Sequence, residues 1–171
     1  MRLILLDSSK LITLVAGWLA EKENFQWLDF GGSRRQLTPA LVKIMAQRET
    51  NVMRVFTADD AETPIGIVGF NHVDRHFKTA TIWAVLGEKS YARLGYTSRA
   101  VSSMLTLGFR ELGFEAINTW VVDSNPSLGV AQRLNFRYIG RQRQCHHIDG
   151  HPFDRLLFDI LPSEHLVHED D

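Results

Sequence analysis

A chain of 171 residues is long enough to bury one substantial core and too short for two domains of ordinary size. Its 19 basic and 20 acidic residues nearly balance, which argues against a nucleic-acid partner, and no apolar run approaches the ~20 residues needed to span a bilayer. Because the first residues lack a signal-peptide pattern and the single Cys145 cannot form an internal disulfide, we expect a cytoplasmic protein.

The first third of the chain is predicted to hold one strand and two helices. A strand over 2–7 precedes a helix over about 8–20, which a serine at either of its first two positions can cap. A threonine followed by a proline opens the second helix, over 38–47, since the missing proline N–H is harmless in a first turn. The aromatic and then basic segment 25–35 reads as a loop, or a short helix that ends in one.

Three strands in succession are predicted over 52–58, 65–73 and 79–86, because polar turn segments separate apolar runs. Short connections of this kind favour an antiparallel meander. A long helix with one apolar stripe follows over 97–112, and the nearly continuous apolar run 117–122 indicates a strand that is buried on both faces. A strand, a helix and a strand in this order require one parallel pair, so the sheet must be mixed.

The C-terminal part is predicted to contain a short helix over 127–135 and two strands over 136–144 and 155–161. Asp149 and Gly150 form a good hairpin turn between these strands, because both residues tolerate positive φ.

We therefore predict a single α/β domain over residues 1–161. It would hold one central mixed, mostly antiparallel sheet of about seven strands, with helices on both faces. The remaining residues, 162–171, are expected to form a flexible tail.

Gly95 is the most informative single position. It follows an apolar strand and opens the long helix, where N–H groups of the first turn have no intrahelical partner and the dipole adds roughly half a positive charge. A phosphate can approach such a turn closely when no Cβ stands in the way, and a tight turn here can require a positive φ. The alternative is a glycine that serves only the geometry of the turn.

Two motifs resemble the GNAT superfamily of acetyl-CoA-dependent N-acyltransferases, nearest the branch of the ribosomal-protein-alanine and spermidine acetyltransferases. The run TIWAVLG over 81–87, followed by YARLGYTSRA over 91–100, is similar to that branch's fourth strand and pyrophosphate loop. The second motif, over 125–136, is similar to the exit of its fifth strand and the next helix. The resemblance covers roughly 64–161 and implies the GNAT fold.

The resemblance also implies where acetyl-CoA binds. The cofactor would lie where the fourth and fifth strands separate, with its pantetheine arm against the backbone of Val85 and Leu86. Its pyrophosphate would meet N–H groups of the loop and first helical turn, namely those of Leu94, Gly95, Tyr96, Thr97, Ser98 and Arg99. Arg93 would add positive charge, and Ser124 or Asn125 would take the place of the family asparagine.

Several positions depart from the family pattern. Ala92, Arg93 and Thr97 stand where the loop usually has Arg or Gln, Gly, and Gly or Ala. Asn135 replaces a glycine, but asparagine also tolerates the left-handed cap. Many relatives carry a tyrosine proton donor where this chain has Ala131, so that mechanism is excluded.

The candidates for proton transfer are few. Ser127 aligns with a serine that lies near the cofactor sulfur in this branch, although a serine that opens a helix is also a common N-cap. Tyr138 is a second candidate acid, with a place in the core or at its rim as the alternative. His72, Asp74 and His76 could accept a proton from the amine, or could be solvated turn residues.

The acceptor side is expected between the first two helices, where Trp27, Phe30, Arg34 and Arg35 lie. Two adjacent arginines favour an acceptor with a phosphate or carboxylate, such as a nucleotide-linked amino sugar or an acidic peptide, over a polyamine. We predict no metal site in the histidine-rich segment 145–151, because successive strand residues point to opposite faces.

The function that this resemblance implies is transfer of an acetyl group from acetyl-CoA to a primary amine by direct attack. The acceptor would be a small molecule, such as an amino sugar or polyamine, or a peptide N-terminus, and both a monomer and a homodimer are open. One alternative is a non-catalytic acyl-CoA-binding module of the same fold. Another is an unrelated mixed α/β domain whose glycine turn binds nothing.

Overall fold

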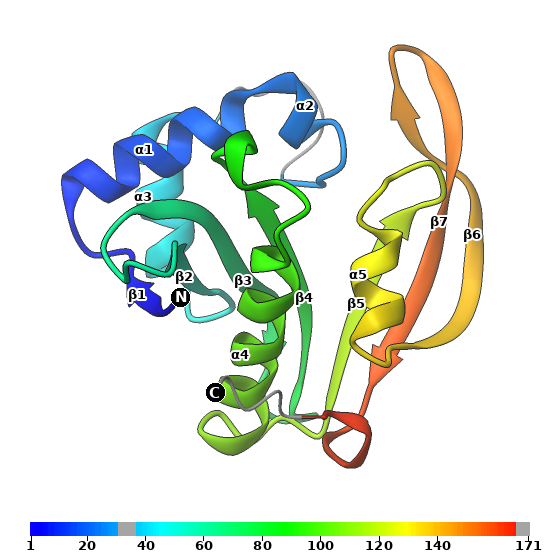
Figure 1. Ribbon diagram of the computed structural model, residues 1–171. Helices are drawn as coiled ribbons and strands as arrows, with labels where there is room; N and C mark the ends of the chain where they lie inside the picture. Colours follow the sequence, from blue (N-terminus) through cyan, green and yellow to red (C-terminus); the bar gives the residue numbers. More distant parts are fainter. Residues whose placement is uncertain (31–36, 167–171) are drawn as a thin grey trace.

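The chain forms one mixed sheet with helices on both faces (Figure 1). The computed structural model describes residues 1–30 and 37–166. Within these residues, seven strands pair in the order β1-β2-β3-β4-β5-β7-β6, and β4 with β5 is the parallel pair among antiparallel neighbours. The predicted fold class and the mixed, mostly antiparallel sheet are therefore confirmed.

The strands are β1 (Leu3–Leu5), β2 (Val52–Thr57), β3 (Pro64–Asp74), β4 (Thr79–Leu86), β5 (Ala116–Val122), β6 (Arg137–Ile148) and β7 (His151–Ile160). The helices are α1 (Ser9–Ala20), α2 (Lys22–Phe25), α3 (Pro39–Gln47), α4 (Tyr96–Arg110) and α5 (Leu128–Arg133). Two short 3-10 turns, η1 (Lys89–Tyr91) and η2 (Pro162–Glu164), complete the described elements. No helix among them is long and apolar enough to cross a membrane.

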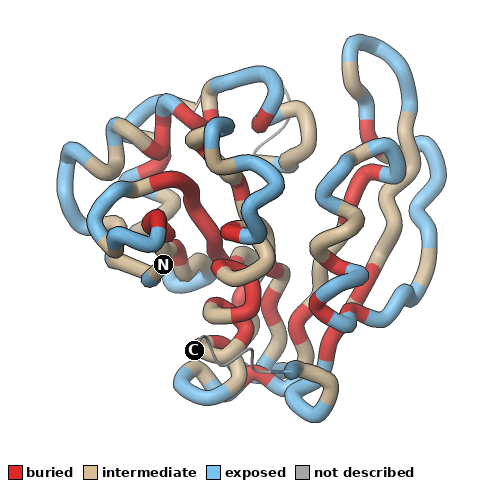
Figure 2. Tube along the Cα trace, in the orientation of Figure 1, coloured by how far each residue is buried: buried red, intermediate tan, exposed pale blue. Residues whose placement is uncertain are grey.

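Two hydrophobic cores lie on the two faces of the sheet. On one face, α1 and α3 bury Val15, Leu19 and Val42 against β2, β3 and β4. On the other, α4 and α5 pack on the central strands, where Met104 and Ile117 are fully buried. Figure 2 shows the buried stretches concentrated along the central strands and α4, whereas the outer strand β6 is largely exposed.

The predicted helix starts are confirmed by their caps. The Leu11 N–H donates to Ser8 Oγ at 3.2 Å, and the Leu41 N–H donates to Thr38 Oγ1 at 3.3 Å, with Pro39 at the first position of α3. Each cap satisfies a donor that would otherwise have no partner in the first turn.

The hairpin of β6 and β7 is longer than predicted. Its turn lies at Asp149 and Gly150 as expected, with φ of 52° and 80°. Pairing, however, continues up to that turn, since His147 faces Pro152 and Ile148 faces His151. The prediction ended these strands early because it relied on apolar alternation, whereas the outer hairpin is joined through its backbone.

Two residues of the segment 162–171, which we expect to be flexible, contact the rest of the domain. The Asn135 side chain donates to the Glu164 carbonyl at 3.0 Å, and the His165 ring lies 2.8 Å from Thr106 Oγ1 on α4. Asn135 has the left-handed conformation predicted for it, with φ of 65°. The cap of α5 thus also anchors the chain after β7.

Candidate active site

The strands β4 and β5 pair over only part of their length. Residues 79–81 of β4 face 116–118 of β5, and the next link is a hydrogen bond of 3.0 Å from Thr119 Oγ1 to the Ile82 carbonyl. Beyond it β4 continues to Leu86 and β5 to Val122, and the two strands diverge (Figure 1). The opening leaves the edge of β4 available to a ligand.

The ladder of β3 and β4 determines which amides line this opening. The Gly87 N–H donates to Ile65 on β3 at 2.9 Å, whereas the Ile82 carbonyl is directed at β5. Because successive strand residues alternate in direction, Ala84 and Leu86 face the opening, and Val85 faces its partner Ile67. The structure therefore supports Leu86 but not Val85 as a backbone partner for a ligand, and it adds Ala84.

The turn before α4 has the predicted geometry. Gly95 is the N-cap with φ of 83°, it is exposed, and no side chain caps the helix. A Cβ added at Gly95 would have no heavy atom within 4 Å, so the space over the turn is open. The N–H groups of Tyr96, Thr97 and Ser98 begin the helix, whereas the Arg99 N–H already donates to the Gly95 carbonyl at 3.1 Å. Arg99 therefore does not belong to the set of available amides.

The side chains of Tyr96 and Arg99 turn to a different partner, Asp59. Tyr96 Oη donates to Asp59 at 3.0 Å, Arg99 Nη1 lies 2.8 Å from it, and the terminal ammonium of Met1 lies 3.0 Å away. This ammonium, followed by the Arg99 guanidinium, lowers the pKa of Asp59 to about 2. Burial is the main cause that raises the pKa of Tyr96. Tyr96 and Arg99 thus link the start of α4 to Asp59.

Arg133 of α5 is a residue that the sequence analysis missed. Its Nη2 donates to Ser98 Oγ at 3.4 Å, so a guanidinium lies beside the first turn of α4. Arg93, with φ of 65° and an exposed side chain, lies just before Gly95. No local signal points to Arg133, because its placement depends on how α5 packs against α4.

The stretch that leads into the turn is tied to α1 and α2. The Trp18 indole donates to Glu88 Oε1 at 3.0 Å, and Lys89 Nζ donates to the Leu86 carbonyl at 2.6 Å and to Asn24 Oδ1. A Cβ added at Gly87 would lie 2.1 Å from the Trp18 ring. These contacts fix the direction of the chain where it continues beyond the end of β4.

Ser127 lies just past the end of β5 and does not cap α5 with its side chain. Instead, its N–H donates to Asn125 Oδ1 at 2.8 Å, and the Asn125 N–H donates to the Val122 carbonyl at 2.8 Å. The capping alternative for Ser127 is therefore wrong. Its exposed hydroxyl lies on the β5 side of the opening, where Asn125 shapes the turn that presents it.

Tyr138 is not brought to the opening. It lies on the outer strand β6, which β7 separates from β5, and its side chain is exposed with its ring 5.7 Å from that of Phe158. The turn between β3 and β4 lies at the opposite end of β4 from the opening. There, Asp74 Oδ1 accepts the N–H groups of His76 and Phe77, both at 2.9 Å, which supports the turn-residue alternative for Asp74 and His76. His72 lies on β3 and lines a pocket on the α3 side of the sheet.

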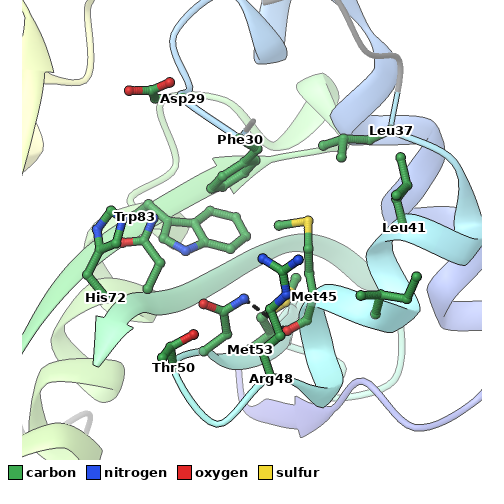
Figure 3. A pocket seen from close by; sticks show the side chains of 13 residues that line it. Asp29, Phe30, Leu37, Leu41, Met45, Arg48, Thr50, Met53, His72 and Trp83 are labelled. Atoms are coloured by element: carbon green, nitrogen blue, oxygen red, sulfur yellow. Dashed lines mark hydrogen bonds between the residues drawn. The ribbon is translucent and has the colours of Figure 1, made fainter. Parts of the chain in front are cut away.

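A pocket of about 330 Å³ lies on the α3 side of the sheet (Figure 3). Phe30 and Trp83 line it with their rings edge to face, 4.7 Å between centroids. Trp27 is half-buried but does not line the pocket, and Arg34 and Arg35 lie outside the described residues. The other lining residues are Asp29, Leu37, Leu41, Ile44, Met45, Arg48, Thr50, Asn51, Met53, Asn71 and His72.

Arg155 of β7 joins the segment after α2 to the strands beyond the opening. Its guanidinium lies 3.8 Å from the centroid of Trp120, donates to Asp29 at 3.0 Å and contacts His146 Nδ1. The other nitrogen of His146, Nε2, lies 2.6 Å from the Gln26 carbonyl, which can only accept. Nε2 of His146 therefore carries a proton and donates it, and Nδ1 accepts from Arg155. Among the described residues, no cluster of His, Cys, Asp or Glu could hold a metal ion.

Comparison with known proteins identifies the family. The family model of the GNAT acetyltransferase domain matches residues 2–137. An uncharacterized N-acetyltransferase of Bacillus subtilis, YoaA, is 27% identical over 104 residues, an alignment that spans 60% of this chain and 58% of that protein. The chain thus aligns with little more than half the length of this curated relative.

Solved structures show the same fold at low identity. A mutant form of the spermidine N-acetyltransferase SpeG from Vibrio cholerae superposes with a TM-score of 0.79 at 14% identity, covering 99% of this chain and 98% of that one. A ribosomal-protein-alanine acetyltransferase from Vibrio fischeri gives 0.75 at 19% identity, covering 96% and 93%. Since this family model matches most of the chain, the protein belongs to the GNAT acetyltransferase family.

Proposed function

We propose that this protein transfers an acetyl group from acetyl-CoA to the primary amine of a small molecule or peptide. The observation that carries the proposal is two sets of available main-chain groups in one segment of the chain. One set lies on the open edge of β4 at Ala84 and Leu86, and the other is the uncapped first turn of α4 after Gly95. A long ligand with amides at one end and a diphosphate at the other fits such a surface.

The residues at the turn fit the diphosphate of CoA. The N–H groups of Tyr96, Thr97 and Ser98 have no intrahelical acceptors, and the helix dipole concentrates roughly half a positive charge there. Arg133 contacts Ser98 in the first turn of α4, and Arg93 lies two residues before Gly95, so these two residues add guanidinium groups near the turn. Arg133 supplies charge that the family loop usually carries at the position of Ala92.

The opening fits the pantetheine arm. The N–H groups of Ala84 and Leu86 and the Ala84 carbonyl are directed away from β3, so they can pair with the amides of the arm as a further strand would. The Leu86 carbonyl already accepts a hydrogen bond from Lys89 Nζ. When bound, acetyl-CoA supplies an activated acetyl thioester. The contribution of the protein is then mainly to hold the amine against it, which removes a large part of the entropic barrier.

Two protons must move during the reaction. An alkyl amine has a pKa of ~10.4 and has to lose a proton before it can attack, so the rate is expected to rise with pH across the neutral range. Ser127 is the group we place at the leaving sulfur, because its hydroxyl is exposed beside the opening and is not engaged in capping α5. His146 is not a candidate base, since both of its ring nitrogens are engaged.

Calorimetry with CoA and a thiol-release assay with acetyl-CoA and a panel of amines test the proposal together. We expect micromolar binding of CoA and release of thiol that requires an amine. Binding without turnover on any amine would support a non-catalytic acyl-CoA-binding module. Absence of binding at millimolar CoA, with no shift in the melting temperature, would overturn the proposal.

A further inference from the structure

The pocket beside Trp83 is placed to receive the body of the acceptor. Its floor is the sheet, with Met53 on β2, Asn71 on β3 and Trp83 on β4, and its roof is α3. The Trp83 indole covers β3 at Gly69, where an added Cβ would lie 3.1 Å from the ring. The pocket thus reaches from β4, the strand that borders the opening, across the face of β3 to β2.

One edge of the pocket borders the opening. Asp29 lines this edge, and its carboxylate is directed out of the pocket in Figure 3, toward the guanidinium of Arg155 at 3.0 Å. Arg155 lies on β7 opposite Val122, the last residue of β5. An amine at the opening can therefore extend its carbon chain over Trp83 into the pocket.

The far side of the pocket carries a cation. Figure 3 shows the Arg48 guanidinium directed inward between Met45 and Met53. Among the described residues, no carboxylate forms an ion pair with Arg48. The one carboxylate that lines the described pocket is that of Asp29, which already pairs with Arg155. If the acceptor were a diamine, its second ammonium group would lie near the Arg48 guanidinium, with no unpaired carboxylate among the described lining residues to offset the repulsion.

Much of the wall of the pocket is apolar, with Phe30, Leu37 and Leu41 among its side chains. An apolar carbon chain fits against these side chains. Asn71 also lines the pocket, but its Oδ1 is closed to solvent and is therefore out of reach of a ligand.

From these observations we infer the class of acceptor: an amine joined through an apolar chain to a carboxylate. The chain lies between Trp83, Phe30 and the methionines, and the carboxylate pairs with Arg48. The inference rests on the proposed function and makes it more specific, because it excludes polyamines as preferred acceptors.

Three amines of equal length test the inference, since they differ only at the end remote from the reacting nitrogen. These are aminohexanoate with a terminal amine, n-hexylamine and the terminal hexanediamine. We expect kcat/KM to fall in that order, with at least about tenfold between the carboxylate and the methyl end, the low limit for a hydrogen bond between charged groups. A preference for the diamine would overturn the inference and leave acetyl transfer intact.

Arg48→Gln should remove most of the preference for the carboxylate over the methyl end, and Arg48→Glu should shift the preference toward the diamine. Lys43→Gln is the matched control, because Lys43 is an exposed cation on α3, the helix that ends just before Arg48, and Lys43 does not line the pocket. It should leave the order of the three amines unchanged. An order that is insensitive to Arg48 would contradict the assignment.

A binding measurement separates this inference from the proposed function. Ligand-observed NMR of aminohexanoate with the wild-type protein, without acetyl-CoA, should show binding that Arg48→Gln weakens and Lys43→Gln does not. That result without any turnover would support the pocket and count against acetyl transfer. No binding of aminohexanoate, or binding that is equal in Arg48→Gln, would overturn the inference whether or not the protein acetylates other amines.

Discussion

The turn at Gly95 and the pocket beside Trp83 are built in different ways. The turn presents backbone N–H groups from one short segment, and the side chains of Tyr96 and Arg99 point away from it toward Asp59. The pocket is made of side chains that four separate segments of the chain bring together. A site of main-chain atoms tolerates changes of side chain, whereas a site of side chains changes its specificity with each substitution. Under the proposed function, this difference explains how proteins of one fold can share acetyl-CoA as the acetyl donor and differ in the amine that they accept.

Gly95→Val should break the main-chain site and give the largest effect. A β-branched residue is strained at φ of 83° and would block close approach to the turn, although Gly95 itself has open space around it. Because two or three charge-assisted hydrogen bonds would be lost, affinity for CoA should fall by about a thousandfold in calorimetry.

Gly113→Val is the matched control for that change. Gly113 has φ of 70° and equally open surroundings, but it lies beyond the other end of α4. Both variants should lose similar stability in chemical denaturation, and only the change at Gly95 should abolish binding. Equal affinities for CoA in the two variants would contradict a role for the turn.

Ser127→Ala tests a side chain on the donor side of the opening. We expect kcat to fall by about a hundredfold, the low end for a group that transfers a proton, while the free energy of unfolding stays constant because Ser127 does not cap α5. Ser8→Ala should behave in the opposite way: Ser8 caps α1, and its loss costs about 1 kcal/mol of stability without changing kcat. If Ser127→Ala kept the full kcat of the wild-type protein, Ser127 would be excluded as the group that protonates the leaving sulfur.

Arg155→Ala tests whether the proposed acceptor pocket can be weakened while the proposed CoA site is kept. The change leaves Asp29 and the buried His146 without their partner, so stability should fall by about 2 kcal/mol and the KM for the amine should rise about tenfold. Affinity for CoA should change much less. Arg141→Ala removes a half-exposed ion pair with Asp154 and serves as the control, with an effect within about 0.5 kcal/mol.

Tyr138→Phe is expected to have the smallest effect. Because β7 lies between Tyr138 and the opening, kcat/KM should stay within about twofold of the wild-type value in the thiol-release assay. A loss of tenfold or more would mean that the β6 side of the hairpin takes part in catalysis, contrary to its position in the sheet.

The sequence predicts the main-chain site better than the site made of side chains. The capped helices, the glycine with positive φ at 95 and the left-handed Asn135 depend on neighbouring residues, and each is confirmed. The sequence does not show that the backbone groups of Val85 are directed at β3. That follows from the register in which β3 and β4 pair. The contact of Asp29 with Arg155 spans 126 positions and depends on the order of the strands. That order also separates Tyr138 from the opening.

The place of Trp18 against Gly87 has a consequence for how the family varies. Because the indole occupies the space that any larger residue at 87 would need, α1 sets the angle at which the donor segment departs from the sheet. A substitution of the buried Trp18, which lies outside both proposed binding sites, would then weaken the proposed binding of CoA. Natural variation at these two positions should consequently be correlated, with a smaller side chain on the helix accompanying a bulkier one at the end of the strand.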